Sequence, residues 1–272
     1  MAPSVDRTAL RAVVRRELRT LTRTRVHLLL AGGFVLAVVG LVWVSGSTGF
    51  VPTVLSLLTP LEVLLPLLTA AFVSRAVLGD RERGELALVR TYPARVRTYV
   101  AGVYLGRVTA LLGAVLVPLL VVLVMVALGS VESTFLVQHS GLDSPVLFVR
   151  FVVLTALFTA VLTAIFTALS AVVRVVRRGV AVAVAVVVLL VVGLDLLIIA
   201  GLATDLLPES ALPVVLTLTP NGAYRSLVLE TVVAPVVTSP VSAGAPLPAV
   251  LALLAWGIGS LVVATLAITG ID

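Results

Sequence analysis

The chain has 272 residues, of which 60% are hydrophobic and only 12% are charged, and its formal net charge is +6. An average soluble domain has about 25% charged residues, and this composition therefore excludes an ordinary soluble fold. Cysteine is absent, which excludes disulfide frameworks, thiolate metal sites and cysteine nucleophiles.

The first predicted element is an amphipathic helix over residues 4–24, within an N-terminal segment 1–25. Its apolar residues recur at helical spacing, whereas Glu17 intrudes on the apolar edge. We expect this helix to lie in the headgroup plane of a membrane, with anionic lipids as partners of its arginines. A basic tail that only sets topology is the alternative. The apolar face carries Leu10, Val13, Val14, Leu18 and Leu21, and the basic face carries Arg11, Arg15, Arg16, Arg19 and Arg23.

Six further stretches are long and apolar enough to cross a bilayer. A hydrocarbon core takes roughly 20 apolar residues of helix, whereas a buried strand takes only about 4–8 residues. We therefore predict an all-α membrane protein with a single six-helix transmembrane domain over residues 26–272. The predicted spans are 26–44, 53–78, 99–128, 149–173, 179–203 and 249–268.

The arginines predict the orientation of these spans. Seventeen of the 19 precede the first span or lie around the second and fourth connections, and only Arg150 and Arg225 fall elsewhere. Because basic residues favour the cytoplasmic side, we expect both termini and the connections at 79–98 and 174–178 to be cytoplasmic in a cell membrane. A cleaved signal peptide over residues 1–46 is disfavoured, because its apolar run exceeds the usual length of about 7–15 residues.

Two carboxylates lie inside predicted spans. Glu62 is in the second span between Pro60 and Pro66, and Asp195 is in the fifth. Both lie at a similar predicted depth, on the order of 12–14 Å below the outer surface. A charge at the centre of a span is costly, so neither should face lipid, and we expect these four residues to line a translocation path. The alternative is a protonated carboxyl that bonds to a neighbouring helix.

The connection between the second and third spans contains the charged run Gly79–Leu86, followed by Thr91-Tyr92-Pro93. The pattern predicts a short helix broken by Gly84 and ending near Pro93. Such a segment could dock a partner protein. A solvated polar loop without a partner is the alternative.

This connection resembles that of type-2 ABC permeases. The residues that carry the resemblance are Glu82, Gly84, Glu85, Leu86, Tyr92, Pro93, Gly102, Gly106 and Arg107. The resemblance implies a coupling helix that docks on a separate ATPase subunit, with Asp80 included in the segment. It also implies a pair of permeases, most simply a homodimer. Within the family the chain most resembles the copper-processing type found with nitrous oxide reductase maturation, and related archaeal permeases of unassigned substrate. It departs from the pattern at Glu85, where Thr or Ser is frequent, and in lacking a basic tail after Gly270.

Residues 204–248 contain seven prolines and cannot form one spanning helix, although they are apolar. We expect them on the outer face, partly as a re-entrant hairpin, with Arg225 near Glu230 or Glu209. The residues Pro220, Tyr224 and Arg225 resemble the stretch that precedes the last span of the same permeases.

Three classes of function remain after these observations. The sequence has no lysine and therefore no Walker A loop. A permease would thus carry no cofactor of its own, and its partner ATPase would bind ATP and Mg²⁺. An intramembrane enzyme is disfavoured, because the H-E-x-x-H and G-x-S-x-G motifs are absent. A membrane scaffold without transport stays open, and nucleic acid is not expected as a partner, because topology already accounts for the arginine clusters.

Overall fold

The computed structural model describes residues 7–84, 96–132, 143–204, 206, 208, 211–236 and 245–270, with only the backbone at 130–132 and at 176 and 177. Within these residues the chain is helical and has no strands. The elements are α1 (Arg7–Arg23), α2 (Arg25–Ser45), α3 (Phe50–Val73), α4 (Ala76–Glu82), α6 (Val96–Glu132), α7 (Pro145–Val172), α8 (Val176–Val188), η2 (Leu189–Gly193), α9 (Leu194–Ala203), α10 (Leu212–Val215), η4 (Leu216–Leu218), α11 (Pro220–Val228), η5 (Leu229–Val233) and α12 (Pro246–Thr269).

Six helical stretches are long and apolar enough to cross a membrane, which confirms the predicted all-α membrane fold with six spans. Several boundaries extend beyond the predicted ones by a few residues, because the helices continue past the apolar windows. The candidate spans are Arg25–Ser45, Phe50–Glu82, Val96–Gly129, Pro145–Val172, Arg178–Ala203 and Pro246–Thr269.

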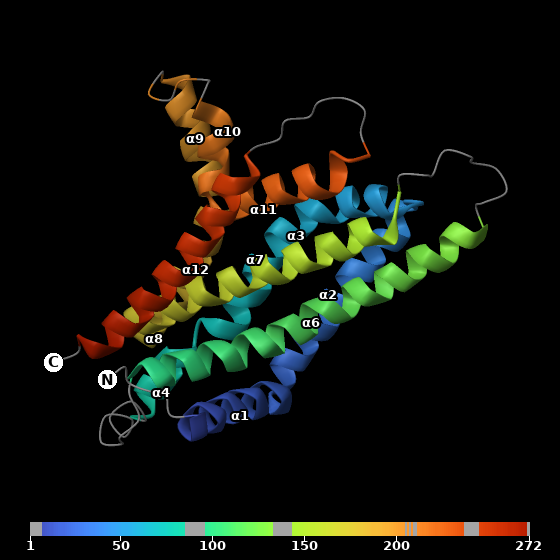
Figure 1. Ribbon diagram of the computed structural model, residues 1–272. Coiled ribbons are helices and arrows are strands. Elements are labelled where there is room, and N and C mark those ends of the chain that lie inside the picture. Colours follow the sequence, from blue (N-terminus) through green and yellow to red (C-terminus); the bar gives the residue numbers. More distant parts are fainter. Residues whose placement is uncertain are drawn as a thin grey trace.

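The centre of the bundle is formed by α3 and α7. More than half of the apolar window of each is buried, whereas at most a third is buried in the other four spans. Along α7 the large side chains of Phe148, Phe151, Phe158 and Phe166 are fully buried, and α3, α6, α11 and α12 pack around it (Figure 1). The outer spans keep wide apolar faces exposed, as expected for helices that contact lipid or another subunit.

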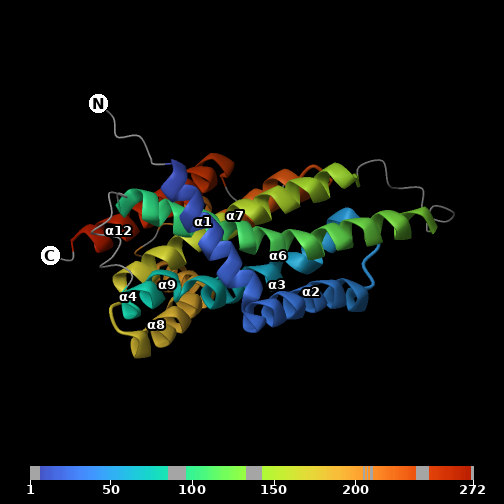
Figure 2. The ribbon, with the colours of Figure 1, turned by 90° about the horizontal axis from the view of Figure 1, so that it is seen from below.

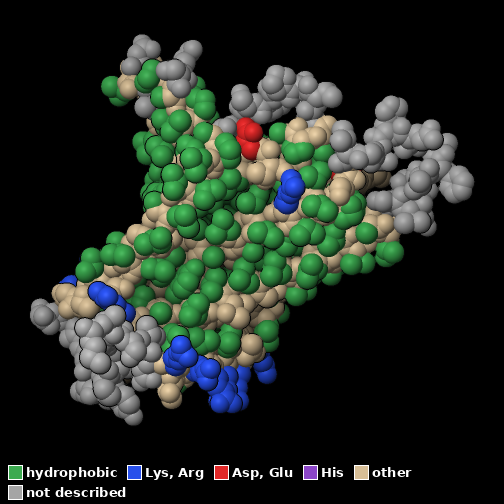
Figure 3. Space-filling view, in the orientation of Figure 1, with side chains coloured by type: hydrophobic (Ala, Val, Ile, Leu, Met, Phe, Trp, Pro, Cys, Tyr) green, Lys and Arg blue, Asp and Glu red, His purple; other side chains and the backbone are tan. Residues whose placement is uncertain are grey.

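The elements α1 and α4 and the end of α12 lie at one end of the bundle, called here the basic end (Figure 1). Arginine side chains gather there along α1 (Figure 3). In the view from below, α1 crosses the bundle over α6 (Figure 2).

Two glycines allow α1 to lie directly on α6. A Cβ atom on Gly102 would lie 2.7 Å from the Cβ atom of Val13, and one on Gly106 would lie 2.5 Å from that of Glu17. Small residues four apart commonly permit such close helix approach. The apolar face of α1, which we expected to lie in lipid, therefore packs in part on α6.

Residues 212–236 form two helical arms that meet at a wide angle between α9 and α12, and this bent segment is called here the hairpin. Its first arm contains α10 and η4, and its second contains α11 and η5 (Figure 1). The Thr219 side chain caps α11 by accepting a hydrogen bond of 3.0 Å from the Gly222 amide. Only glycine fits at position 222, because a Cβ atom would overlap the Leu216 carbonyl oxygen.

Candidate functional site

Glu62 and Arg225 form a bidentate ion pair between α3 and the hairpin. Arg225 donates from Nε to Oε1 of Glu62 at 2.8 Å and from Nη2 to Oε2 at 2.5 Å. Glu62 is only 3% exposed and lies twelve residues after Phe50, which is about 18 Å along the helix at 1.5 Å per residue. The hairpin therefore brings a guanidinium deep between the spans.

Asp195 is the third member of this cluster. One of its carboxylate oxygens lies 3.8 Å from Nη1 of Arg225. The sequence placed Glu62 and Asp195 at a similar depth, and the structure brings both carboxylates to one guanidinium. One guanidinium shares its donors between two carboxyl groups, and the Asp195 side chain is 29% exposed. The cluster can therefore offer an incompletely paired carboxylate to a cation or a polar solute.

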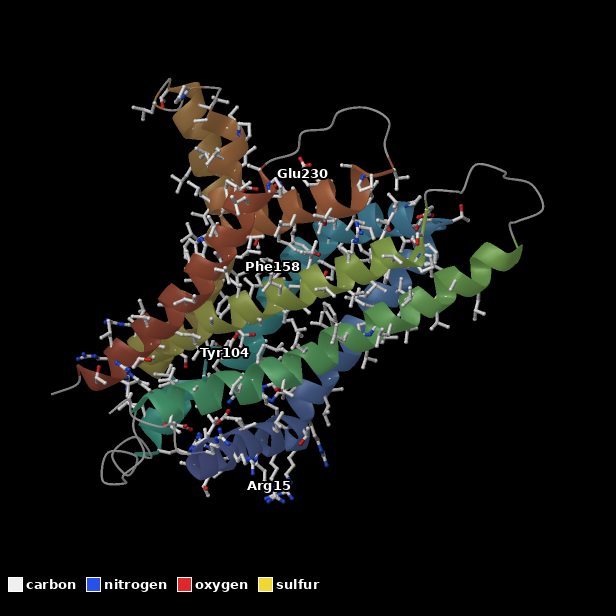
Figure 4. All side chains as sticks on the ribbon, in the orientation of Figure 1. Arg15, Tyr104, Phe158 and Glu230 are labelled. Atoms are coloured by element: carbon white, nitrogen blue, oxygen red, sulfur yellow. The ribbon has the colours of Figure 1, made fainter. Side chains whose placement is uncertain are left out.

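The expected partners of Arg225 were wrong. We expected Glu230 or Glu209, whereas the guanidinium contacts Glu62 and Asp195. In Figure 4 the Glu230 side chain points away from α7, and Glu209 lies outside the described residues. The physical reason is that the Glu62 carboxylate, 3% exposed inside α3, would be strongly destabilised without a cationic partner.

Asn221 supports the same site, and the sequence analysis missed it. Pro66 has no backbone N–H, so the carbonyl of Glu62, four residues earlier, loses its helical donor. The side-chain amide of Asn221 donates to this carbonyl at 3.2 Å. A proline four residues after a buried carboxylate was the available signal, since it predicts a carbonyl that needs a donor from elsewhere.

Tyr224 fixes the hairpin against α7. Its ring stacks on Phe158, with centroids 4.6 Å apart and an interplanar angle of 4°. Its hydroxyl lies 2.9 Å from the hydroxyl of Thr155. Pro220 occupies the first turn of α11, where its missing N–H costs nothing. The three hairpin residues singled out from the sequence thus form the start of α11 and its contacts with α3 and α7.

The backbone around the cluster is irregular in all three elements. Pro60 and Pro66 lie inside α3 on either side of Glu62. The π-helical segment η2 ends two residues before Asp195, and a second one, η5, begins four residues after Arg225. Short π segments occur frequently at functional sites. All three charged side chains are therefore carried by helices with weakened hydrogen-bond ladders.

The predicted partner-docking segment begins with α4. Glu82 and Gly84 are exposed, and Gly84 adopts a φ of 73°, which only glycine readily provides. Asp80 is instead 2% exposed and accepts hydrogen bonds from Arg16 and Arg83 at 2.5 Å each. The Asp80 side chain therefore stabilises α4 from its buried face. Asp80 also accepts a bond of 2.6 Å from Tyr99, and Glu85, Leu86, Tyr92 and Pro93 lie outside the described residues.

Glu17 and Arg107 extend this ionic network beneath α1. Arg107 donates to Glu17 at 2.7 Å and to the Phe72 carbonyl at 2.5 Å, while Arg16 donates to Glu17 at 2.8 Å. Burial tends to lower the pKa of Arg16, but Asp80 and Glu17 raise it above the usual value. The intrusion of Glu17 on the apolar face of α1 is thus explained by a buried arginine on α6.

The helices α4 and α7 cap each other. The Ser170 hydroxyl accepts hydrogen bonds from the amides of Val77 and Leu78 at 3.0 and 3.1 Å. In return, Arg81 donates to the carbonyls of Ala171 and Val173 at 2.9 and 2.8 Å. These bonds satisfy backbone groups that helix ends leave unpaired. Because Thr155, fifteen residues before Ser170 on the same helix, contacts Tyr224, α7 touches both the docking segment and the hairpin.

One known protein family matches nearly the whole length of this chain. A family model described as "ABC-2 family transporter protein" matches residues 11–268, which include every contact described above. No curated protein matches the chain.

Proposed function

The chain belongs to the ABC-2 transporter family, and from this membership we propose that it is the permease subunit of an ATP-driven transporter whose ATPase is a separate chain. The single observation that carries the proposal is the family match across all six candidate spans. The absence of lysine supports the separate ATPase, because a Walker A loop requires one. ATP and Mg²⁺ would accordingly bind in the partner.

The proposed contact with the ATPase is the connection that starts at α4. Glu82 and Gly84 are exposed there, and α4 is fastened to α7 through Ser170 and Arg81. Movement of a docked partner would thus be transmitted to α7 through the hydrogen bonds that join the start of α4 to the end of α7. The remaining proposed contacts are Glu85, Leu86, Tyr92 and Pro93, which come from the family resemblance alone. The same resemblance is the only support for the copper-processing subtype.

The proposed translocation path runs beside Glu62, Asp195 and Arg225. Support comes from the position of this ionic cluster among the spans, where charge is costly unless it serves a function or is fully paired. Pro60 and Pro66 would allow α3 to bend around the cluster. A cation or polar solute would contact Asp195, whose carboxylate is the least completely paired.

The topology proposed for the subunit follows from its charges. The arginines on α1 and around α4 would face the cytoplasm and the anionic lipids of the cell membrane, with both termini on that side. Exposed apolar faces on α2, α8 and α12 leave room for a second copy of the chain, in a homodimer.

The test is co-purification with a candidate P-loop ATPase and measurement of ATPase activity in the complex. We expect the wild type to capture and stimulate the ATPase, and the Glu82→Ala/Glu85→Ala variant to lose both effects. Glu230→Ala removes a carboxylate of the hairpin that lies outside the proposed ATPase contact, and should behave as the wild type. Failure of the wild type to bind any ATPase encoded with it would favour a scaffold without transport.

A further inference from the structure

A polar cavity at the basic end is not used by the proposed transport mechanism. It has a volume of about 530 Å³ and lies between α1, α2, α4 and the end of α3. Four arginines and three carboxylates line it, so its net charge is positive. The arginines are Arg16, Arg75, Arg83 and Arg107, and the carboxylates are Glu17, Asp80 and Glu82.

Most of this charge is already compensated inside the protein. Glu17 pairs with Arg16 and Arg107, and Asp80 pairs with Arg16 and Arg83. These ion pairs hold the side chains that line the cavity in place, but their charges largely cancel and add little to the electrostatic potential inside it.

Arg75 is the exception. It follows directly after the end of α3 and is exposed, and within the described part of the chain it makes no ion pair. A guanidinium lining a cavity without a carboxylate partner is a ready donor to a phosphate. Glu82, the exposed carboxylate of the cavity, likewise has no ion-pair partner among the described residues, and it lies seven residues, or about two helical turns, farther along the chain.

His27 supplies a second unused polar group in the same cavity. Its Nδ1 atom is buried and has no hydrogen-bond partner among the described residues. The ring is held against Phe72, with centroids 4.8 Å apart. A buried polar atom without a partner is costly, so a ligand that bonds to it would gain affinity.

The position of these two residues identifies the source of the phosphate. His27 is near the start of α2 and Arg75 lies just past the end of α3, and these antiparallel spans place both at the basic end of the apolar region. That level corresponds to the headgroups of one leaflet. Next to His27, α2 exposes Val26 and Leu29 along its side, which offers acyl chains an apolar surface.

We propose that this cavity binds the headgroup of an anionic phospholipid, with the phosphodiester on Arg75 and a headgroup hydroxyl on Nδ1 of His27. The lipid would fill the space between α1 and the end of α3 and would hold α1 against the bundle. The proposal concerns the permease alone and does not depend on an ATPase or on transport.

The test uses the full chain extracted from vesicles of mixed phosphatidylglycerol and phosphatidylcholine, with retained lipid counted by native mass spectrometry. We expect the wild type to retain phosphatidylglycerol over phosphatidylcholine. Loss of one charge-assisted hydrogen-bonding group in Arg75→Gln should lower this retention about tenfold. Arg75→Lys, which keeps the charge, should retain most of the lipid.

Arg19→Gln is the matched control, because Arg19 is exposed on α1 at the same end but does not line the cavity. An equal loss in Arg19→Gln would mean diffuse surface attraction and would overturn the site. Unchanged retention in Arg75→Gln would overturn it as well. Displacement of the lipid by glycerol phosphate in the buffer would overturn the lipid assignment in favour of a soluble phosphate. Gel filtration of each variant checks that the bundle has folded.

Discussion

The side chain of Asn221 replaces the backbone donor that Pro66 lacks, because it donates to the carbonyl of Glu62 at 3.2 Å. A break in one spanning helix is thus repaired by the hairpin. The Glu62 residue is held twice by that hairpin, through its carbonyl by Asn221 and through its carboxylate by Arg225.

The first prediction tests this repair. Asn221→Ala should destabilise the bundle by about 1–3 kcal/mol, because a buried carbonyl loses its donor. Adding Pro66→Ala restores a backbone N–H four residues after Glu62, so the double variant should recover part of the loss. Thermal unfolding in detergent measures the coupling between the two changes. Strict additivity would show that Asn221 does not substitute for the proline amide.

The second prediction concerns the ion pair. Arg225→Gln leaves Glu62 buried without a partner and should cost about 3 kcal/mol, at the low end for broken buried pairs because the arginine side chain is partly exposed. Neutralising both residues in Glu62→Gln/Arg225→Gln should be less damaging than the single change.

Arg150→Gln is the control for charge loss, since Arg150 is exposed and, among the described residues, its side chain bonds only to the Thr231 carbonyl, at 3.2 Å. It should change the unfolding midpoint little. If Arg225→Gln were equally harmless, the pair would not contribute to stability.

The third prediction concerns the junction of α4 with α7. Ser170→Ala removes the acceptor of the Val77 and Leu78 amides. Their hydrogen exchange should accelerate about tenfold, as expected for a loss near 1.4 kcal/mol. Stimulation of the ATPase should fall while its binding is retained.

Thr109→Ala removes a comparable hydroxyl whose bond, in the part of the chain that the structure describes, stays within its own helix, at 2.7 Å to the Leu105 carbonyl. Exchange at the start of α4 should be unaffected in this control. Equal exchange in Ser170→Ala and the wild type would show that the cap does not hold α4.

The fourth prediction tests the packing of α1 on α6. Gly106→Val would place its side chain against Glu17 and should displace α1 from α6. Trypsin should then cleave at the arginines of α1 faster than in the wild type. Gly113→Val is the control, because a Cβ atom at Gly113 meets nothing within 4 Å. Similar cleavage of both variants would contradict close packing at Gly106.

The number and approximate limits of the spans could be predicted because a bilayer fixes the length of an apolar helix. The proximity of Glu62 and Asp195 followed from counting residues along antiparallel spans. The pairing of Arg225 with Glu62 could not be predicted from the sequence. The depth of the hairpin depends on side-chain contacts such as that of Tyr224 with Phe158, and hydrophobic periodicity does not reveal such contacts.

The interior position of Asp80 was missed for a similar reason. A charged run of this kind is usually solvated, and its burial depends on Arg16, sixty-four residues away. Gly102 and Gly106, on which α1 packs, could be recognised in the sequence as part of a family pattern. Their contact with α1 became evident only from the structure.

The threonines of α7 set how this helix can move. Thr159, Thr163 and Thr167 are fully buried, and each hydroxyl donates to the carbonyl four residues earlier in the same helix. In the described part of the chain, these three hydroxyls have no hydrogen bond to another helix. Within this stretch the Tyr104 hydroxyl of α6 donates a long hydrogen bond of 3.4 Å to the Ala160 carbonyl, so among the described residues sliding or rotation would break only this weak bond between helices. Because α7 is joined to α4 by Ser170 near its end and to Tyr224 by Thr155 near its middle, it would transmit a displacement of α4 to the hairpin along this stretch.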